Sequence, residues 1–517
     1  MKLNYKRTIL VGFAFFLICA FWQAYDATIP VILTNKYGMS QFWSGVIMAL
    51  DNVLALFMLP LFGTLSDKCK SKRGKRTPFI IFGTVVAAVA LVALSFVDNM
   101  QLQKIFEYTA LDDVPTLERI YDEQADAVLK TPEGDEFQLK ELFSKEKFSQ
   151  IKVNETDPLT GKTKVTTAYT NYVAPAREAC VAEITNSDPG ALILFVVLLL
   201  VILVSMSTFR SPAVALMPDV TVKPLRSKAN AVINLMGTAG GIVVLVLGIV
   251  FATSSVANGF MSYTVYYAVI AGLMLVSLAV FLLTVREPAW AKQMQEDTVR
   301  YGIEEEEAVQ SETRKLTTGE MRSLILILLS VALWYFGYNA VTSKYAVYAT
   351  NILDMDYNTT MLLAQGAAIV AYMPAGIIAS KIGRKKTILA GVAILALAFG
   401  IASFMRAGSP VMLMNILFIA AGVGWATINV NSFPMAVELS SGADVGKYTG
   451  YYYTASMAAQ TLTPLLSGYL MDNVADTILF PYAAVFVALA IVTMLFVTHG
   501  DNKVDGKKDL EAFDIED

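Results

Sequence analysis

The stretch FWQAYDATIP, residues 21–30, places one carboxylate, Asp26, in a run that is otherwise apolar or aromatic. A charged carboxylate inside a lipid-compatible helix is costly unless it is paired, neutralised or hydrated. Trp22 lies one turn before Asp26 on the same helical face, with Gln23 beside it. An indole can cover the apolar side of a ligand while the amide and the carboxylate bond its hydroxyl groups. These residues predict a ligand and proton site; the alternative is a structural acid paired with a neighbouring helix.

Two further features bear on a proton role. Pro30 follows Asp26 by four residues and cannot donate an N–H to its carbonyl, so the sequence predicts a bend there. A second acid, Asp51, lies with Asn52 in the outer half of the next apolar run. Loss of hydration favours the protonated form of either aspartate, as a proton carrier that alternates between wet and dry surroundings requires. Asp51 could instead cap or pair at the outer surface.

Other polar and aromatic side chains recur at helical spacing in apolar runs. The predicted cavity-lining set is Asn234, Trp334, Tyr338, Asn339, Gln365, Trp425, Asn429 and Gln460. The alternative is hydrogen bonding between helices, worth about 0.6–2 kcal/mol each in membranes. Lys344, near the outer end of one run, either extends to the surface or supplies a counter-charge to Asp26 or Asp51.

The elements that carry these residues are apolar runs. Of the 517 residues, 55% are hydrophobic and 16% charged, whereas soluble domains carry about 25% charged residues. Each run has about the 20 residues that cross a bilayer as a helix. The twelve predicted spans are 8–34, 41–65, 77–97, 190–210, 226–252, 261–285, 323–349, 358–380, 387–405, 410–437, 447–471 and 477–499. The predicted fold is an all-α membrane protein.

The distribution of basic residues predicts the orientation. Lys and Arg cluster in residues 68–76 and 381–386, whereas the short loops on the other side hold little beyond Lys36 and Arg406. Both termini and these clusters are therefore predicted to be cytoplasmic, in a multi-pass protein of the cell membrane. The only histidine, His499, ends the last span, so proton chemistry must depend on carboxylates.

Two polar segments interrupt the spans and divide the chain. Residues 98–188 are acidic, carry turn signals and are predicted to form a small ordered extracytoplasmic domain, and residues 286–322 a cytoplasmic linker. The predicted six-helix bundles are 1–97 with 189–285, and 323–499, followed by a cytoplasmic tail, 500–517. Two matching motif pairs, GTLSDKCKSKRGKR with RSPAVALMPD and GIIASKIGRKK with NSFPMAVE, indicate that the bundles are repeats.

The two glycine- and lysine-rich segments resemble the cytoplasmic loop signature of the major facilitator superfamily. ALDNVLALFMLPLFGTLSDK, RSPAVALMPD and VGKYTGYYYTASMAAQTLTPLLSGYLMD resemble the glycoside–pentoside–hexuronide cation symporters. Within these, the similarity is closest to the sucrose-transporter-like branch of solute carrier family 45. This resemblance implies sugar uptake driven by protons. Sodium-using members have paired aspartates where this chain has Ala55 and Leu59, so the resemblance implies protons rather than sodium.

Charged residues in the loops are candidates for a gate between the halves. Asp67 could face Lys447 at the start of a later span, where the helix dipole favours an anion. Arg384 with Glu438 would be the counterpart in the second half. Arg210 is predicted either to pair with Asp219 as a cytoplasmic charge or to hold a carboxylate in the cavity. Arg73 and Arg76 complete the candidate gating set.

The sequence thus predicts a proton-coupled symporter for a disaccharide or oligosaccharide such as sucrose or maltose, working by alternating access. Its predicted partners are the sugar, the proton and the bilayer; nucleic acid, cofactors and metals are not expected, and it should act as a monomer. No pattern for covalent catalysis is present, so an enzyme is not predicted. The alternatives are a proton-driven exporter of small organic solutes and a transporter-like sensor with vestigial transport.

Overall fold

The computed structural model describes residues 3–156, 163–222, 225–300, 316–439 and 445–501. Within these ranges eleven helices are long and apolar enough to cross a membrane, so the chain is a multi-pass membrane protein. The predicted span 447–471 forms a helix, α16 (Val445–Asn473), but α16 is not one of the eleven. Its many Tyr, Thr, Ser and Gln residues make it more polar than the other long helices.

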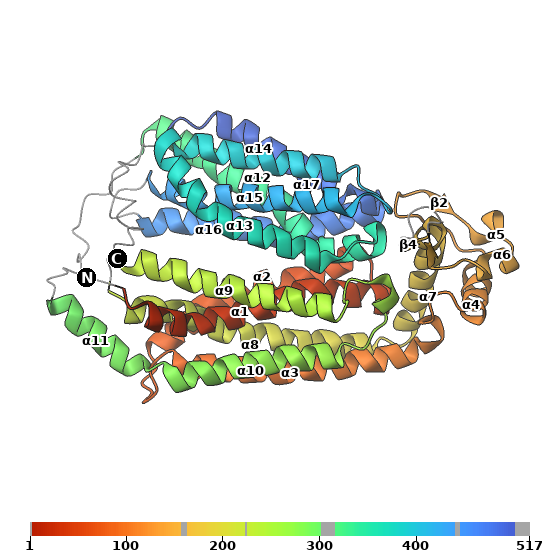
Figure 1. Cartoon of the computed structure of the whole chain (residues 1–517), viewed down its shortest axis with the longest axis horizontal. Helices are drawn as coiled ribbons and strands as arrows, with labels where there is room; N and C mark the ends of the chain where they lie inside the picture. Colours follow the sequence, from red (N-terminus) through yellow and green to blue (C-terminus); the bar gives the residue numbers. More distant parts are fainter. Residues whose placement is uncertain (1–2, 157–162, 223–224, 301–315, 440–444, 502–517) are drawn as a thin grey trace.

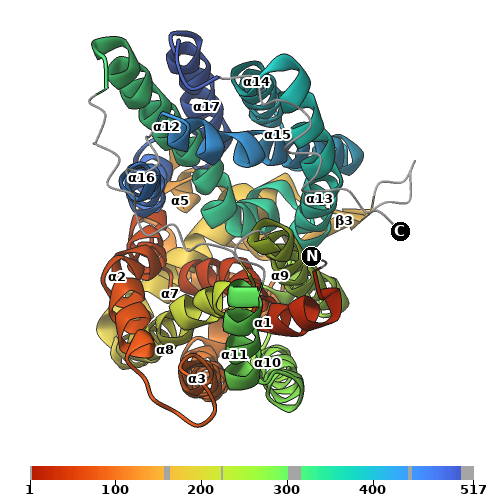
Figure 2. The ribbon, with the colours of Figure 1, turned by 90° about the vertical axis from the view of Figure 1, so that its left-hand side faces the viewer.

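The long helices form two groups (Figures 1 and 2). The first, here called the N-terminal half, contains α1 (Tyr5–Val31) with a π-helical turn (Ile32–Lys36), α2 (Gln41–Asp67), α3 (Thr77–Lys104), α8 (Gly190–Val220), α9 (Arg226–Val250) and α10 (Thr264–Thr284). In this half α1 packs along α9, and α3 packs along α8. Its apolar core is fully buried and includes Phe21, Leu199 and Tyr266.

The C-terminal half contains α12 (Thr318–Tyr348) with a π-helical turn (Ala349–Leu353), α13 (Tyr357–Ile382), α14 (Arg384–Ala402), α15 (Val411–Val437), α16 and α17 (Leu479–Leu495). Contacts between the halves are made by α2 with α16, α9 with α13 and α1 with α12. Residues on these helices can therefore face a ligand from both halves.

The two halves repeat each other in their backbone. Gly38 and Asp354 both have positive φ, 62° and 52°, and each follows a π-helical turn that ends a long helix. Asn35 and Asn351 are 316 residues apart and donate amide hydrogen bonds to each other, at 3.4 and 2.8 Å. The same offset relates the first residues of α2 and α13, Gln41 and Tyr357. These matching breaks support the internal duplication that the motifs indicate.

A small α/β unit, here called the inserted unit, lies between α3 and α8 at one end of the bundle (Figure 1). It contains a 3-10 turn (Phe106–Tyr108), α4 (Val114–Gln124), β1 (Leu129–Lys130), β2 (Glu136–Phe137), α5 (Leu139–Leu142), α6 (Lys145–Ser149), β3 (Asn154–Thr156), β4 (Thr163–Val165), a π-helical turn (Tyr169–Val173) and α7 (Ala174–Ser187). Two antiparallel hairpins, β1–β2 and β3–β4, are its only strand pairs in the described residues. Its own apolar cluster, around Ile120, Phe148 and Val173, indicates an ordered unit.

Several boundaries differ from the sequence expectation. Helix α3 runs to Lys104 rather than ending at 97, because Asp98 and Gln101 are buried with partners instead of exposed. Helix α8 continues through Pro212 and Pro218 to Val220. The predicted linker includes α11 (Glu287–Arg300). At Pro30 the helix continues, and its hydrogen-bonding register changes to π-helical two residues later.

Candidate functional site

Four of the predicted residues come together in the N-terminal half. Asp26 is partly buried on α1 and is close enough to Asp51 on α2 for the two carboxylates to interact electrostatically. The guanidinium carbon of Arg210, on α8, lies 5.7 Å from the centroid of the Trp22 ring. Arg210 also interacts electrostatically with Asp51. Two acids and one cation thus share a region bordered by an indole, the composition needed to hold and release a proton.

Arg210 does not pair with Asp219 in the described residues. It lies beside the membrane-embedded Trp22 and near Asp51, whereas Asp219 forms its ion pairs with Arg76, at 2.8 Å, and Lys75, at 3.2 Å. Because α8 is helical through both prolines, Arg210 stays within the span instead of ending it. No described acidic side chain forms a direct ion pair with Arg210, although it is largely buried.

Amide and hydroxyl groups connect the two halves at the level of Gln23. Gln23 on α1 donates to the hydroxyl of Tyr357 on α13, at 3.1 Å. Gln365, also on α13, donates its amide N–H to the Gln23 carbonyl oxygen at 2.6 Å. Gly241 on α9 faces the same amides, since a Cβ there would lie 3.2 Å from the Gln365 oxygen. This chain links the predicted residues Gln23 and Gln365 across the boundary between the halves.

The C-terminal half contributes an aromatic surface. The rings of Tyr338 and Trp425 stack with centroids 3.7 Å apart and an interplanar angle of 3°, and Tyr335 meets Trp425 edge-on at 5.2 Å. Tyr338 is close enough to Asp26 for the two side chains to interact electrostatically. Stacked rings that present a flat face near polar groups suit the apolar side of a pyranose ring.

The repeat relates the aromatic and amide residues in pairs. The 316-residue offset seen for Asn35 and Asn351 also relates Trp22 to Tyr338 and Gln23 to Asn339. The indole Nε1 of Trp22 and the Nδ2 of Asn339 are buried donors without a hydrogen-bond partner in the described part of the chain. Buried donors of this kind also occur in the apolar core, as at Nε1 of Trp334, so they support a ligand site here only together with the polar groups around them.

The other predicted cavity residues differ in burial and partners. Trp334 is fully buried in the apolar core of the C-terminal half, and we therefore leave it out of the proposed site. Asn234 is exposed. Asn52 donates to Asp51 at 2.9 Å, and Asn429 hydrogen-bonds with Tyr372. Gln460 is partly buried on α16. Helical spacing alone identified these residues, and it does not distinguish a cavity face from a packed or lipid-facing one.

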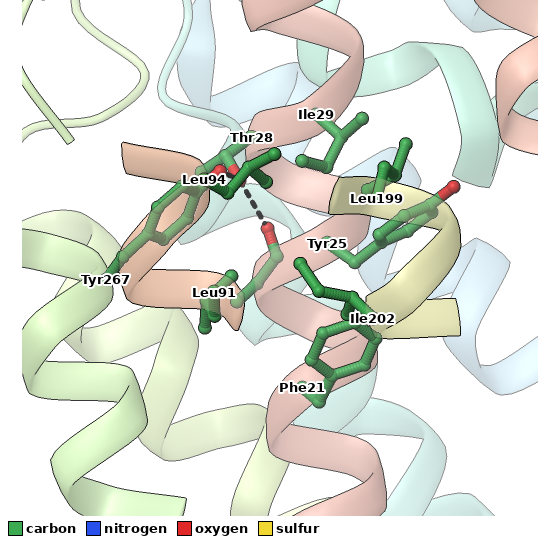
Figure 3. A pocket seen from close by; sticks show the side chains of 10 residues that line it. Phe21, Tyr25, Thr28, Ile29, Leu91, Leu94, Leu199, Ile202 and Tyr267 are labelled. Atoms are coloured by element: carbon green, nitrogen blue, oxygen red, sulfur yellow. Dashed lines mark hydrogen bonds between the residues drawn. The ribbon is translucent and has the colours of Figure 1, made fainter. Parts of the chain in front are cut away.

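A small cavity lies behind α1, inside the N-terminal half (Figure 3). Its volume is about 10 Å³, room for about one water. It lies between Leu91 and Leu94 of α3, Leu199 and Ile202 of α8, and Tyr267 of α10, whose hydroxyl is 2.7 Å from that of Thr28. Asp26 is not among its lining residues. The cavity is a packing space and is too small for a sugar.

The predicted gating residues form contacts within each half at the end opposite the inserted unit. The Arg76 guanidinium binds Asp67, Asp219 and Ser66. Arg384 forms the expected ion pair with Glu438. Arg73 is exposed and its backbone N–H bonds the Ser71 hydroxyl. The side chain of Lys447 lies outside the described residues, so its predicted pairing with Asp67 is not addressed, and the Asp67 pair described here stays within one half.

Sequence reasoning missed three buried charge sites. Glu287, in the predicted linker, accepts hydrogen bonds from the backbone N–H groups of Arg76 and Thr77 at 2.9 and 2.8 Å. It thereby satisfies the start of α3, where the helix dipole favours an anion.

Lys344 is at the second site. The sequence predicts that it extends to the surface or balances Asp26 or Asp51, but it is fully buried at the other end of the molecule and donates to the Gln41 carbonyl at 2.5 Å. The carboxylates that act on its charge are Asp472 and Asp476. No pattern around these acids predicts their distant partners, because those partners come from loops and helices hundreds of residues away.

Lys36 and Asp98 form the third site. The Lys36 ammonium donates to both oxygens of Asp98, at 2.8 and 2.7 Å, and to the carbonyl of Met261 at 2.7 Å. Both side chains are fully buried, and the ammonium lies 4.6 Å from the centre of the Tyr263 ring. The sequence analysis counts Lys36 among the basic residues of a short loop, but the residue belongs to the π-helical turn that continues α1 and carries it into the bundle.

Comparison with known proteins agrees with this architecture. Residues 356–513 match the family model Major Facilitator Superfamily, and residues 10–109 match the model MFS/sugar transport protein. Among the described residues no group of three or more His, Cys, Asp or Glu side chains is placed to hold a metal.

Two curated relatives are sucrose transport proteins of Arabidopsis thaliana. SUC4 is 37% identical over 60 residues, covering 12% of each chain. SUC3 is 36% identical over 59 residues, covering 11% of this chain and 10% of that protein. The similarity thus spans only about a tenth of the length of these relatives.

Solved structures share the fold over nearly the whole chain. The inward open xylose transporter XylE from E. coli has a TM-score of 0.58 at 15% identity, covering 99% of this chain and 100% of that one. A D-xylose-proton symporter has a TM-score of 0.57 at 13% identity, covering 96% and 99%. The two family models and the sucrose transport relatives are similar to parts of the same chain. Two parts of the chain, residues 10–109 and 356–513, are thus similar to models of the major facilitator superfamily, and the whole chain shares the fold of the solved transporters.

Proposed function

We propose that this protein is a proton-coupled sugar symporter that works by alternating access. The observation that carries the proposal is that Asp26 interacts electrostatically with Tyr338 and Tyr357 of the C-terminal half, beside aromatic and amide groups from both halves. Tyr338 and Trp425 offer a flat stacking face, and the Gln23 and Gln365 amides lie at the boundary between the halves. A carboxylate, aromatic faces and amides are the groups that bind a polyhydroxylated ligand. A disaccharide such as sucrose or maltose fits this inventory better than an apolar solute.

In this scheme the proton is carried by Asp26 or Asp51. A membrane-embedded carboxylate is less costly when protonated, so proton uptake removes a charge before the halves move. The nearby cation of Arg210, which interacts with Asp51, would stabilise the ionised acid after the proton leaves. Differential stabilisation of this kind links proton binding and sugar binding to the same conformational equilibrium.

We further propose that α16 is the twelfth membrane span and that the termini are cytoplasmic. Helix α16 lies between α2 and α12, so much of its surface is shielded from lipid, which tolerates its polar composition. The basic residues of 68–76 and 381–386 support the orientation. The described hydrogen bonds between the halves lie near the middle of the spans or at the inserted-unit end. The conformation is therefore proposed to be closed outside and open toward the cytoplasm.

Counterflow in proteoliposomes tests the sugar assignment. Vesicles loaded with unlabelled sucrose or maltose should transiently accumulate the labelled sugar without any ion gradient. A sugar panel at two pH values should identify the substrate, and an inward proton gradient should then drive net accumulation. Counterflow of small amphiphiles without counterflow of any sugar would favour the exporter and contradict the symporter.

Trp22→Ala is expected to raise the Michaelis constant for sugar. Loss of an aromatic contact of about 0.5–1.5 kcal/mol corresponds to about a two- to twelvefold weaker affinity. Trp22→Phe should keep most of the ring contact, and Trp43→Ala is a matched control because Trp43 is 58% exposed. Initial uptake rates over a range of sugar concentrations measure the change. An unaltered Michaelis constant in Trp22→Ala would place the indole in packing alone.

A further inference from the structure

The inserted unit is built onto the N-terminal half. The chain enters the unit from α3 and leaves it into α8. The side-chain amide of Gln101, on α3, donates to the Thr185 hydroxyl of α7 at 3.1 Å and to the Lys36 carbonyl at 2.8 Å. Gly38, between α1 and α2, lies so close to α7 that a Cβ there would be 2.5 Å from the backbone nitrogen of Ala182. These contacts fix the unit to the N-terminal half.

The same unit also contacts every connection of the C-terminal half at this end of the molecule. These connections are residues 349–356, 403–410 and 474–478. In the first, the carboxylate of Asp354 accepts a hydrogen bond from the Val165 N–H of β4 at 3.0 Å. In the second, the guanidinium of Arg406 lies 3.6 Å from the carboxylate of Glu133. The unit thus extends over the outer ends of helices that belong to the other half (Figure 1).

The third connection receives the turn between β1 and β2. A Cβ at Gly134 would lie 2.2 Å from the Val474 carbonyl oxygen, and Gly134 has a φ of 94°. Both observations require glycine at this position. The Thr477 N–H donates to the Pro132 carbonyl at 3.3 Å. The turn therefore rests backbone against backbone on the connection between α16 and α17.

The two halves are closed against each other beneath the unit. The carboxylate of Asp472, on α16, accepts hydrogen bonds from the backbone N–H groups of Gln41 and Phe42, both at 2.7 Å. These are the first two residues of α2, so an acid of one half caps a helix of the other. The amides of Asn35 and Asn351 also bond each other across the halves. Separation of the halves at this end would break all of these contacts.

We propose that the inserted unit is a strap that holds the two halves closed at the outer end and must release the C-terminal half before the outer side can open. This inference rests on the alternating access and the orientation proposed above. A unit that stays with the N-terminal half loses its contacts with Asp354, Arg406 and residues 474–477 when the halves separate. The strength of these contacts therefore sets how often the outer side opens.

The reactivity of a thiol at position 31 measures this opening. Val31, at the outer end of α1, is 2% exposed and packs in the apolar core of the C-terminal half, so a reagent reaches it only when the halves separate. Val31→Cys is made in a full chain whose native cysteines, Cys19, Cys69 and Cys180, are replaced by alanine. In right-side-out vesicles, its rate of reaction with a membrane-impermeant maleimide is proportional to the open fraction.

An exposed thiol gives the reference rate. Ala257, between α9 and α10, is exposed at the same end of the molecule. Minor conformations of proteins are about 0.1–10% populated, so Val31→Cys should react about 10- to 1,000-fold more slowly than Ala257→Cys. Equal rates would mean that the outer end is not held closed.

Asp354→Gly, added to Val31→Cys, is expected to raise the rate at position 31 about tenfold. Glycine adopts the φ of 52° found at this position, but it removes the acceptor of the Val165 N–H. Loss of one hydrogen bond to a charged group is enough to change the ratio of closed to open molecules about tenfold. Asp354→Asn is the matched control, because asparagine keeps a side-chain acceptor and tolerates this φ. Its rate should stay near that of the parent.

A reversible bridge tests the strap in the opposite direction. Glu133→Cys and Arg406→Cys place two thiols where the unit meets the C-terminal half, at side chains that are 56% and 45% exposed. A short bifunctional thiosulfonate that joins them should suppress the reaction at position 31, and reduction should restore it. The same reagent on Glu133→Cys alone modifies that residue without a bridge and should leave the rate unchanged.

The two measurements address different parts of the strap. The bridge shows whether the unit must release the C-terminal half, and Asp354→Gly shows whether the native contact favours closure. The strap is rejected if the bridge does not lower the rate at position 31 or if Asp354→Gly does not raise it. Sugar counterflow is measured separately. Absent counterflow with the expected changes in thiol reactivity would therefore refute the symporter and not the strap.

Discussion

Asp26→Asn is expected to abolish uphill sugar accumulation while sugar exchange between the two sides continues. Asparagine matches the size and polarity of a protonated aspartate but cannot release a proton. The variant should therefore resemble a permanently loaded carrier, in which sugar binding and the movement of the halves remain possible. At one proton per sugar, a gradient of one pH unit supports about tenfold accumulation, and in the variant this ratio should fall to about one.

Accumulation and counterflow in the same proteoliposomes measure this difference. Asp51→Asn provides the comparison between the two acids, because Asp51 already accepts a hydrogen bond from Asn52 and interacts with Arg210. Replacing external sodium with potassium should leave uptake by the parent chain unchanged. Normal accumulation by Asp26→Asn would remove Asp26 from proton coupling, and strong sodium dependence would reverse the choice of ion.

The repeat supports the proposed site between the halves. Trp22 with Gln23 and Tyr338 with Asn339 are the same positions of two related helices, 316 residues apart. Each pair offers an aromatic face and an amide, so a ligand between the halves meets similar chemistry from both sides. Asp26 breaks the symmetry, because the equivalent residue is Thr342. The proposed proton carriers, Asp26 and Asp51, both lie in the N-terminal half.

The sequence predicts the long helices well. Polar backbone groups are costly to expose to lipid, so a segment that crosses the membrane must be a long apolar helix, and the length of an apolar run identifies it. It also places Asp26, Gln23 and Gln365 on the helices that meet. It fails for Trp334, whose helical spacing matches that of Tyr338 although its side chain enters the core. It also leaves Arg210 open between two positions. Both cases depend on how a helix is rotated about its axis, and packing against neighbours decides that rotation.

The predicted ends of the spans are less accurate for a related reason. Asp98 is read as the start of a polar domain, yet it belongs to α3 because Lys36 neutralises it within the bundle. Glu287 is read as a linker residue, yet it caps α3. In both cases a buried acid has a partner from another part of the chain. A local pattern cannot distinguish such an acid from one that faces water.

The Lys36–Asp98 pair gives the largest expected effect on stability. Lys36→Met leaves the Asp98 carboxylate buried without its cation, which should cost about 3–5 kcal/mol of unfolding free energy. The double variant, Lys36→Met with Asp98→Leu, removes both charges and should recover most of this lost unfolding free energy. Burial of the Lys36–Asp98 pair itself costs desolvation free energy, and the double variant no longer carries that cost. Unfolding by denaturing detergent, followed by far-ultraviolet circular dichroism, measures the three free energies.

The more exposed pair Lys104–Asp188 provides the matched control. Its side chains are 27% and 64% exposed, against 0% for both Lys36 and Asp98. Lys104→Met should therefore cost less than about 1 kcal/mol, since water replaces the lost partner. If Lys36→Met were as mild as Lys104→Met, water would have to reach Asp98 in the folded protein. If the double variant were no more stable than Lys36→Met, the loss would come from the missing lysine contacts with Met261 and Tyr263 rather than from an unpaired charge.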